Sequence, residues 1–327
     1  MKKFDVISVG SALKDIFILN KDMSCQGAKI CHPFNPEVVG EKIKIEKMYF
    51  DIGGGGTNVA ATLANMGIKT ALLSRVGADL AGQEIIRTMK KFGVGTELIA
   101  IDKKEETGYS VIFLDKDGER TALVFRGASD FVDFNPKKVV QLKANWFFIT
   151  SLNANMKLLN QLFAVAKKNK IKIAWNPGGA ELELGSLKLK KMLKATDILF
   201  LNMSEAQKLT RTKTKNIKTV LETLGGLASK AVVVVTGGKA GAWVKNGPEL
   251  LWADILDKKV VNATGAGDAF GSGFVAGLIL YKGNIKKALQ LGMLNSNSVV
   301  TAMGAKQGIL KKPPMGKELE RITVKAL

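Results

Sequence analysis

The chain has 327 residues, of which 46% are hydrophobic, and this apolar fraction excludes a disordered chain and a small disulfide scaffold. Lysine and arginine number 49 against 29 acidic residues, a formal net charge of +20, so nucleic-acid binding has to be considered. The lysines are spread as pairs, without a long basic run or interleaved aromatic residues. We therefore expect a generally basic surface and no nucleic-acid partner.

Three further features bear on where the protein works. The most apolar window, residues 274–281, is far shorter than the roughly 20 residues that a membrane span needs, so no membrane partner is expected. The apolar run near the N-terminus is broken by Asp15 without a small-residue cleavage site, which predicts a β-strand rather than a signal peptide. Cys25 and Cys31 are the only cysteines, which excludes a disulfide framework and predicts a cytoplasmic protein.

Short apolar runs alternate with helical patterns along most of the chain. The expected strands cover residues 5–10, 69–77, 144–150, 171–175, 197–202 and 231–238. The expected helices cover residues 57–67, 81–93, 153–170 and 216–229, with N-caps at Asp79 and Asn153 and C-caps at Gly67 and Gly93. This alternation predicts right-handed crossovers and a largely parallel sheet with helices on both faces. Such an α/β sheet binds ligands at the carboxyl ends of its strands.

Two segments interrupt the alternation, and we expect them to form a small second sheet. Residues 15–50 contain extended patterns such as GEKIKIEKMYFD, and residues 107–126 read as a β-hairpin with its turn at 115–118. Strands with one polar and one apolar face, inserted between βα units, predict a lid over the strand ends. The chain is thus predicted to be one domain over residues 1–327, with lid insertions at about 15–50 and 107–126.

The stretch DIGGGGTNVAATLANMG places four glycines before a predicted helix. Backbone without Cβ atoms lets a ligand approach closely, and Asn58 in the first turn can offer its amide to hydroxyl groups. A flexible turn with Thr57 as the helix cap is the alternative. The stretch is not a dinucleotide fingerprint, and the chain has no G-x-x-x-x-G-K-[ST] loop, so ATP would be held without a Walker A motif.

The stretch NATGAGDAF combines small residues with one acid. Gly265, Ala266 and Gly267 lack bulk, so the N–H groups of residues 265–268 can converge at a helix N-terminus and form an anion hole. Asp268 in the same turn would repel a resting anion, and an ordinary helix-stabilising acid is the alternative. The combination predicts phosphoryl transfer, in which Asp268 accepts a hydroxyl proton while the amides stabilise the transferred group.

Four motifs, each at a predicted strand end, resemble those of the ribokinase-like sugar and nucleoside kinases, also called the PfkB family. In chain order they are Gly53-Gly54 with Asn58, Ala60, Gly67 and Gly77; Asn202-Met203-Ser204-Glu205; the loop from Thr236 to Gly241; and the run from Thr264 to Asp268. The resemblance spans nearly the whole chain. It implies the ribokinase-like three-layer α/β/α sandwich with a small β-sheet lid, and an ATP-dependent kinase acting on a primary hydroxyl of a sugar.

The resemblance also implies a role for each motif. The catalytic group is implied to comprise Asp268 as base, with Gly265, Ala266 and Gly267 completing the anion hole. The acceptor pocket is implied to comprise Asp15, Gly54, Gly55, Asn58 and Asp268. ATP is implied to contact Asn202, Thr236, Gly238, Gly241, Gly265 and Gly267, and the region 293–308 is implied to wall the adenine pocket. Asn202 and Glu205 are implied to organise the hydration shell of Mg²⁺, although Glu205 alone reads as an ordinary N-terminal helix acid.

The chain departs from the family pattern in two places. Asn262 and Ala263 stand where the last signature usually has Asp and Thr, so the resemblance leaves activation by K⁺ in doubt. Gly55 stands where ribokinases usually have lysine, so ribose specificity is not supported.

Several alternatives stay open from the sequence. A nucleoside kinase shares all four motifs, and a regulator that binds ligands without catalysis would have no need of Asp268. The spacing of Cys25 and Cys31 is wrong for a zinc knuckle, and His32, the single histidine, lies in the predicted lid, which argues against a Ser-His-Asp triad. The expected partner is a sugar or nucleoside substrate, and an apolar outer face of the lid would favour a homodimer.

Overall fold

The computed structural model describes residues 4–19, 24–25, 31–32, 42, 44–114, 120–133 and 143–327. Its centre is a ten-stranded sheet in the order β16-β15-β14-β13-β12-β11-β10-β1-β6-β7. Seven neighbouring strands of this sheet pair in parallel. They are β1 (Phe4–Val9), β6 (Thr70–Gly77), β7 (Ile99–Asp102), β10 (Ala144–Ile149), β11 (Lys172–Trp175), β12 (Ile198–Asn202) and β13 (Val232–Thr236). Three antiparallel strands extend one edge: β14 (Ala242–Asn246), β15 (Glu249–Ala253) and β16 (Val324–Ala326).

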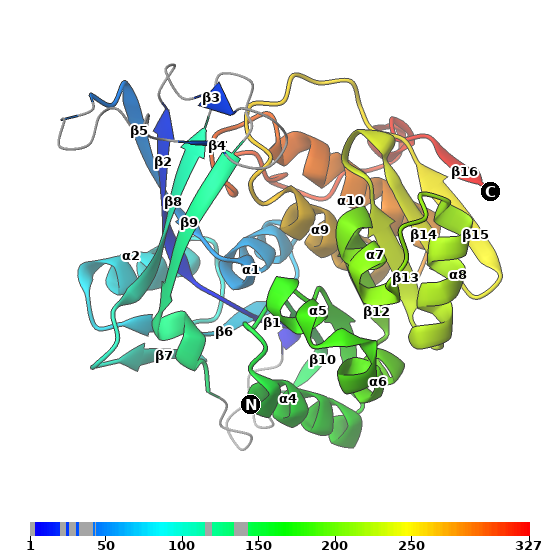
Figure 1. The fold of residues 1–327 in the computed structure, drawn as a ribbon, viewed down its shortest axis with the longest axis horizontal. Helices are drawn as coiled ribbons and strands as arrows, with labels where there is room; N and C mark the ends of the chain where they lie inside the picture. The colour runs from blue at the N-terminus through cyan, green and yellow to red at the C-terminus, as the bar shows by residue number, and fades with distance from the viewer. Residues whose placement is uncertain are drawn as a thin grey trace.

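Helices cover both faces of this sheet (Figure 1). Their bounds are α1 (Gly55–Asn65), α2 (Leu80–Lys91), α4 (Met156–Asn169), α5 (Gly179–Glu183), α6 (Gly185–Ala195), α7 (Met203–Thr210), α8 (Ile217–Leu227), α9 (Ala266–Leu280), α10 (Ile285–Val299) and α11 (Lys317–Glu320). Successive residues of β10 alternate between two cores: Phe147 and Ile149 pack with α4, α6 and α8, and Phe148 packs with α1, α9 and α10. The predicted α/β/α sandwich is confirmed. No helix in the described part of the chain is long and apolar enough to cross a membrane.

Helix α9 is held firmly because its small residues let neighbouring elements approach. A Cβ atom on Gly277 would lie 2.5 Å from Ala288 Cα, so α10 packs directly against the α9 backbone. On the sheet side, the Phe200 ring stacks with Phe148 at 5.7 Å and meets Phe274 edge-on at 5.7 Å. Aromatic pairs of this kind contribute about 0.5–1.5 kcal/mol each beyond their buried area. This packing positions the N-terminus of α9 at the carboxyl edge of the sheet.

Asp79 caps α2 as predicted, accepting a hydrogen bond from Gly82 N at 2.7 Å. The N-cap predicted at Asn153 is wrong. Asn153 and Ala154 have φ values of 53° and 55°, outside the helical region, and the side chain that accepts from Leu158 N is that of Asn155.

The helix expected near Thr57 begins two residues earlier, at Gly55, with Gly54 as the N-cap at φ 93°. Thr57 is therefore inside the helix, where its hydroxyl donates to Gly53 O at 2.7 Å instead of capping the N-terminus. The glycine run thus forms part of the first helical turn rather than only the loop before it.

A separate four-stranded sheet, called the lid below, has the order β5-β2-β8-β9. Its strands are β2 (Leu13–Leu19), β5 (Lys47–Gly53), β8 (Thr107–Leu114) and β9 (Arg120–Gly127). β2 pairs antiparallel with β5 and parallel with β8, and β8 pairs antiparallel with β9. In Figure 1 these strands project together beyond the end of the central sheet. The predicted turn at 115–118 lies outside the described residues, and the assignment of residues 1–327 to one domain stays a prediction.

Two short strands, β3 (Ser24–Cys25) and β4 (Cys31–His32), form an antiparallel pair in which Cys25 is opposite Cys31. The side chains of Cys25, Cys31 and His32 are outside the described part of the structure, and so are the roles considered for them.

Candidate active site

The carboxyl end of the sheet is tightly packed where β1, α1 and β10 meet. Gly10 follows β1, and a Cβ atom there would lie 2.0 Å from Thr150 Oγ1 and 2.8 Å from Gly56 N. Only glycine allows so close an approach. The first turn of α1 is thereby held against the ends of two central strands. This places the motif at 53–58 where parallel α/β sheets bind their ligands.

Asn58 and Asp268, which belong to two different predicted motifs, are in direct contact. Asn58 Nδ2 donates a hydrogen bond of 2.8 Å to Asp268 Oδ2, although the two residues are 210 positions apart. Asn58 lies in the first turn of α1 and Asp268 in the first turn of α9. The predicted acceptor motif and the predicted anion-hole motif therefore meet at one point.

The N-terminus of α9 contains two glycines with different environments. Gly265 is the N-cap with φ 79°, and a Cβ atom there would lie 2.5 Å from Ala305 Cβ, so this position requires glycine. Gly267 is helical, and a Cβ atom on it would meet no atom within 4 Å. Ala266 N donates to Ala263 O at 3.3 Å, within the turn that leads into the helix. The first-turn amides, the positive end of the helix dipole and the open space beside Gly267 together suit an anion.

Two acids are neighbours at the base of the lid. Asp15 on β2 is paired in register with Asp51 on β5. Asp15 is 4% exposed, and its carboxylate oxygens would lie 2.1 Å from a Cβ atom on Gly53. Asp51 Oδ1 accepts from Ile52 N at 2.8 Å, and its buried Oδ2 has no hydrogen-bond partner among the described residues. Asp15 is a predicted site residue, whereas Asp51 was missed because no motif spacing marks it.

Lys306 is a second residue that sequence reasoning missed. It is 4% exposed, and its Nζ donates to Ile52 O and to Asn58 Oδ1. Burial lowers the pKa of the Lys306 ammonium. Three negative charges oppose that lowering of the pKa, those of Asp51, Asp15 and Asp268. The sequence feature that could have marked Lys306 is its place within the small-residue run GAKQG. The family resemblance implies instead that the region 293–308 walls the adenine pocket.

Asn202 and Glu205 form a capping box at the start of α7. Glu205 N donates to Asn202 Oδ1 at 2.9 Å, and Asn202 N donates to Glu205 Oε2 at 2.8 Å. Glu205 therefore stabilises the N-terminus of α7, and its part in holding Mg²⁺ stays a prediction. Burial raises the pKa of Glu205, the hydrogen bond from Asn202 lowers it in part, and the negative charge of Asp268 raises it further. Glu205 and Asp268 thus share one electrostatic environment.

The oxygen donors near Asp268 fit Mg²⁺ bound in part by ATP. Carboxylates such as Glu205 are the donor type that Mg²⁺ prefers, and Mg²⁺ usually keeps several waters and takes one or two protein carboxylates plus phosphates. The described part of the chain contains no group of three or more His, Cys, Asp or Glu that could hold a metal by itself. A cation bound near Glu205 would favour its ionised form, whereas burial and the negative charge of Asp268 raise the pKa of this carboxyl group.

The predicted nucleotide loop lies beside Asn202, because Thr236 on β13 is in register with it. Gly238 and Gly241 have φ values of 58° and 86°. A Cβ atom on Gly241 would lie 2.1 Å from Ala253 O, so packing against β15 already requires a glycine there. A Cβ atom on Gly238 would meet nothing within 4 Å, which leaves space for a ligand.

Asn262 and Gly55, at which the chain departs from the family pattern, both have close contacts with their neighbours. Asn262 is fully buried, and its Oδ1 accepts from Thr264 N at 2.9 Å, so the side chain stabilises the turn before α9. At Gly55, a Cβ atom would lie 2.8 Å from Thr150 Oγ1 and 2.9 Å from Thr150 Cβ, so a larger side chain would need the neighbouring strand end to shift.

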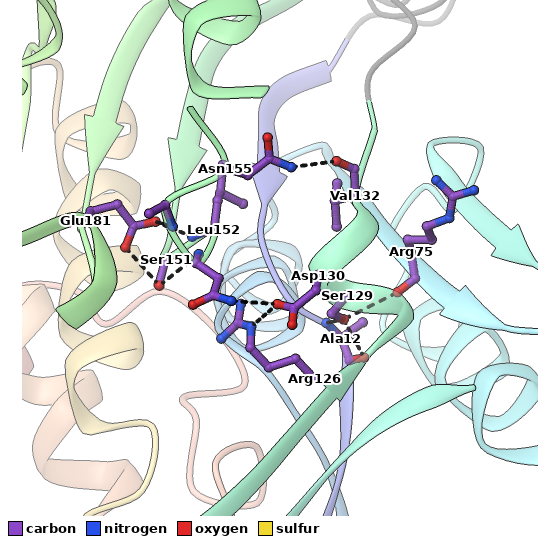
Figure 2. A network of polar contacts seen from close by, with 12 residues as sticks. Ala12, Arg75, Arg126, Ser129, Asp130, Val132, Ser151, Leu152, Asn155 and Glu181 are labelled. Atoms are coloured by element: carbon purple, nitrogen blue, oxygen red, sulfur yellow. Dashed lines mark hydrogen bonds and ion pairs between the residues drawn. The ribbon is translucent and has the colours of Figure 1, made fainter. Parts of the chain in front are cut away.

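A polar network that no motif predicted ties the lid to the core (Figure 2). Arg126 at the end of β9 donates to Asp130 Oδ1 at 2.6 Å, and Asn153 Nδ2 donates to the same oxygen at 3.1 Å. The buried Glu181 accepts from Leu152 N at 2.6 Å and orders the loop that carries Asn153. The base of the lid is thus fixed to the loop after β10.

Comparison with known proteins identifies a family and a relative that the chain resembles. The family described as pfkB family carbohydrate kinase matches residues 21–312. A protein of Archaeoglobus fulgidus named as an uncharacterized sugar kinase is 27% identical over 257 residues, covering 76% of this chain and 97% of that protein.

Solved structures agree with the fold. The ribokinase of Arabidopsis thaliana, in complex with ribose and ATP, has a TM-score of 0.78 at 21% identity, with 98% of both chains covered. A Burkholderia thailandensis nucleoside kinase in complex with inosine has a TM-score of 0.77 at 16% identity, covering 97% of this chain and 96% of that one. The ribokinase-like fold predicted from the sequence is confirmed.

The family match spans most of the chain, from residue 21 to residue 312. Members of this family are phosphotransferases that use an alcohol group as acceptor. The predicted enzyme class is therefore confirmed, and the chain belongs to the pfkB family of carbohydrate kinases.

Proposed function

We propose that the protein transfers the γ-phosphoryl group of ATP to a primary hydroxyl of a sugar, with Asp268 as the base. The observation that carries this proposal is the hydrogen bond between Asn58 and Asp268, which joins the acceptor motif to the N-terminus of α9. Asp15, buried at the base of the lid, supplies the carboxylate that would hold further hydroxyl groups of the acceptor. A module that only binds ligands would have no use for a base at this position.

The arrangement supports an in-line displacement. The acceptor hydroxyl would hydrogen-bond Asp268, and its proton would pass to that carboxylate late, as the oxygen–phosphorus bond forms. The amides of residues 265–268 would stabilise the charge on the transferred phosphoryl oxygens. When bound, Mg²⁺ would supply neutralisation of the β- and γ-phosphate charge, with Glu205 and Asn202 holding its waters. Closure of the lid would exclude water and suppress hydrolysis of ATP.

A nucleoside is the second candidate acceptor, and one observation favours it. Phe17 is fully buried on the lid face that packs against Met303, and Tyr49 is its cross-strand partner. Cross-strand partners share a face, so Tyr49 lies on the same side as Asp15 and could stack on a base. The Arabidopsis ribokinase was solved with ribose and the Burkholderia kinase with inosine, so relatives of similar fold cover both classes.

A coupled assay of ADP release over pentoses, hexoses, sugar phosphates and nucleosides, with and without K⁺, tests the proposal. We expect slow ATP hydrolysis by the protein alone and a large rise with one acceptor class. Mass spectrometry should then show the acceptor with one added phosphoryl group. Absence of a phosphorylated product across all four classes would overturn the assignment, and the arm without K⁺ decides the open question at Asn262.

Glu205→Gln is expected to reduce kcat by about 10–100-fold without lowering stability at neutral pH. Glutamine still accepts the capping hydrogen bond from Asn202 N, but it lacks the charge that Mg²⁺ waters require. Because the pKa of Glu205 is raised in the folded protein, the folded state loses stability as the pH rises from the ordinary glutamate pKa through the raised value. The variant escapes that loss, so its Tm relative to wild type should rise with pH over this window.

The measurements are thermal unfolding across this pH range and kcat as a function of Mg²⁺ concentration. Glu222→Gln on the exposed face of α8 is the matched control and should change neither. A Glu205→Gln variant with wild-type Mg²⁺ dependence would remove Glu205 from the proposed Mg²⁺ site.

We also propose that two copies pair through the outer face of the lid. Phe50, Ile16, Val111 and Leu123 form one cross-strand row over the four lid strands. Phe50 is 61% exposed and Leu123 is 58% exposed. The row lies on the face opposite Phe17, so it points away from the core, and a second copy of the same row would cover it. Analytical ultracentrifugation, which measures the mass in solution, tests this proposal.

A further inference from the structure

We infer that Lys306 is a positioning residue of the acceptor site, a built-in cation that orients Asn58 toward Asp268 and balances the carboxylates around it. The inference rests on the proposed function, because it gives Lys306 a part in the same phosphoryl transfer. It is carried by three sets of contacts, which concern the Asn58 amide, the surrounding charges and the backbone next to Lys306.

The first set fixes the orientation of the Asn58 amide. An ammonium group can only donate hydrogen bonds, so the amide atom that faces Lys306 Nζ must be the oxygen. The amide nitrogen then points the other way and donates to Asp268 Oδ2 at 2.8 Å. Without Lys306, the amide could rotate by half a turn and present its oxygen to the carboxylate, which would be repulsive. Lys306 therefore ensures that the amide nitrogen of Asn58, and not its oxygen, faces the Asp268 carboxylate.

The second set concerns charge. Lys306 is almost completely buried, and its other hydrogen-bond partner is a backbone carbonyl, Ile52 O, which carries no net charge. The charges that face its ammonium are those of three acids on three elements, Asp15 of β2, Asp51 of β5 and Asp268 of α9. A fourth acid, Glu205 of α7, interacts electrostatically with Asp268. The buried cation of Lys306 opposes the repulsion that the neighbouring acids exert on the Asp268 carboxylate.

The third set shows that residues 304–306 belong to this site. A Cβ atom on Gly304 would lie 2.2 Å from Asp51 Oδ2, and Ala305 packs against Gly265 at the N-terminus of α9. Lys306 then reaches Asn58, so three consecutive residues contact the lid base, the anion-hole turn and α1. Gly55, in contrast, has no room for a side chain beside Thr150. The cation that contacts the first turn of α1 is therefore Lys306, through Asn58.

Lys306→Met should reduce kcat on the order of 10²-fold, the loss expected when a reacting group is misplaced by about 1 Å. The acidic limb of the pH profile of kcat/KM should move to higher pH by about one unit or more, because a nearby cation no longer favours the Asp268 carboxylate. A residue that only fills space would leave this limb unmoved. Lys311→Met, an exposed lysine five residues further along, is the matched control and should keep wild-type kinetics.

Two further variants make the test independent of the folding of Lys306→Met. Lys306→Ala should regain at least 10-fold in kcat when methylammonium or ethylammonium is added, and should gain nothing from tetramethylammonium, which has no N–H donor. Asn58→Leu keeps Lys306 and removes the amide that donates to Asp268. The acidic limb of its pH profile of kcat/KM should move in the same direction as that of Lys306→Met. Circular dichroism establishes which variants are folded.

The outcomes separate the two levels of the proposal. A wild-type protein that phosphorylates no acceptor contradicts the proposed function, whatever the variants do. An active wild type with Lys306→Met of equal kcat and unmoved acidic limb contradicts only the role of Lys306. If Lys306→Met does not fold, an unmoved limb in Asn58→Leu overturns that role in its place.

Discussion

Asp268→Asn is expected to lower kcat by about 10²–10⁴-fold while the affinity for ATP stays close to that of wild type. An asparagine can still accept the hydrogen bond from Asn58 Nδ2, so the local geometry is retained. It cannot take up the hydroxyl proton as the phosphoryl group is transferred, so the loss falls on the chemical step. The backbone amides of residues 265–268 are unchanged, so the phosphates should bind as before.

The comparison needs steady-state kinetics with the acceptor found by screening and a direct measurement of ATP binding by calorimetry. Asp257→Asn, which removes an exposed acid from the segment before α9, is the matched control for the change in net charge. If Asp268→Asn turned over at the wild-type rate, Asp268 would be a helix-stabilising acid and another base would have to be sought.

Gly267→Ala should produce opposite changes in stability and activity. Gly267 is inside α9 and a Cβ atom there meets no atom within 4 Å, so alanine is tolerated and can raise the free energy of unfolding by up to about 1 kcal/mol. The Cα–Cβ bonds of a helix tilt toward its N-terminus, so the added methyl group would stand beside the first-turn amides. We expect kcat to fall on the order of 10²-fold, similar to the loss of one donor from an anion hole.

Gly226→Ala provides a matched control for this experiment. Gly226 is also exposed inside a helix, α8, and a Cβ atom there would likewise meet nothing within 4 Å. Both variants should show a slightly higher Tm, and only Gly267→Ala should lose activity. Equal kcat values in the two variants would show that no phosphoryl group approaches the N-terminus of α9.

The parallel core of the fold is predictable from sequence because its strands are buried on both faces. Runs such as AVVVVTGG on β13 have few polar positions, and glycines at positive φ, such as Gly67 and Gly93, mark helix ends. The antiparallel strands β14 to β16 are harder to predict, because none of them has a continuous buried run: β14 and β15 mix buried with partly exposed residues, and β16 has no buried residue. The prediction of an N-cap at Asn153 is wrong for a similar reason, namely a contact with a distant residue. Glu181 holds the loop by accepting a hydrogen bond from Leu152 N, and Asn153 has a positive φ within that loop.

Some residues of the candidate site can likewise be predicted from the sequence, and others cannot. Asp268 and Asn58 can be found from sequence because each follows small residues at the start of a helix, where local spacing carries the signal. Asp51 and Lys306 acquire their place only through strand register and through contacts between distant segments. The pairing of Asp15 with Asp51, for example, depends on how β2 and β5 align, which local patterns do not determine.

The contact between Asn58 and Lys306 spans 248 positions of the chain, and this separation has a consequence for biosynthesis. The strands and helices of the first half can form as they leave the ribosome, but the proposed acceptor site lacks the contact between Lys306 and Asn58 until residues 304–306 have been made. Long-range contacts of this kind form late in folding, because the intervening chain must be ordered first. A nascent chain stalled before this segment would therefore carry most of the sheet but an incomplete form of the proposed acceptor site.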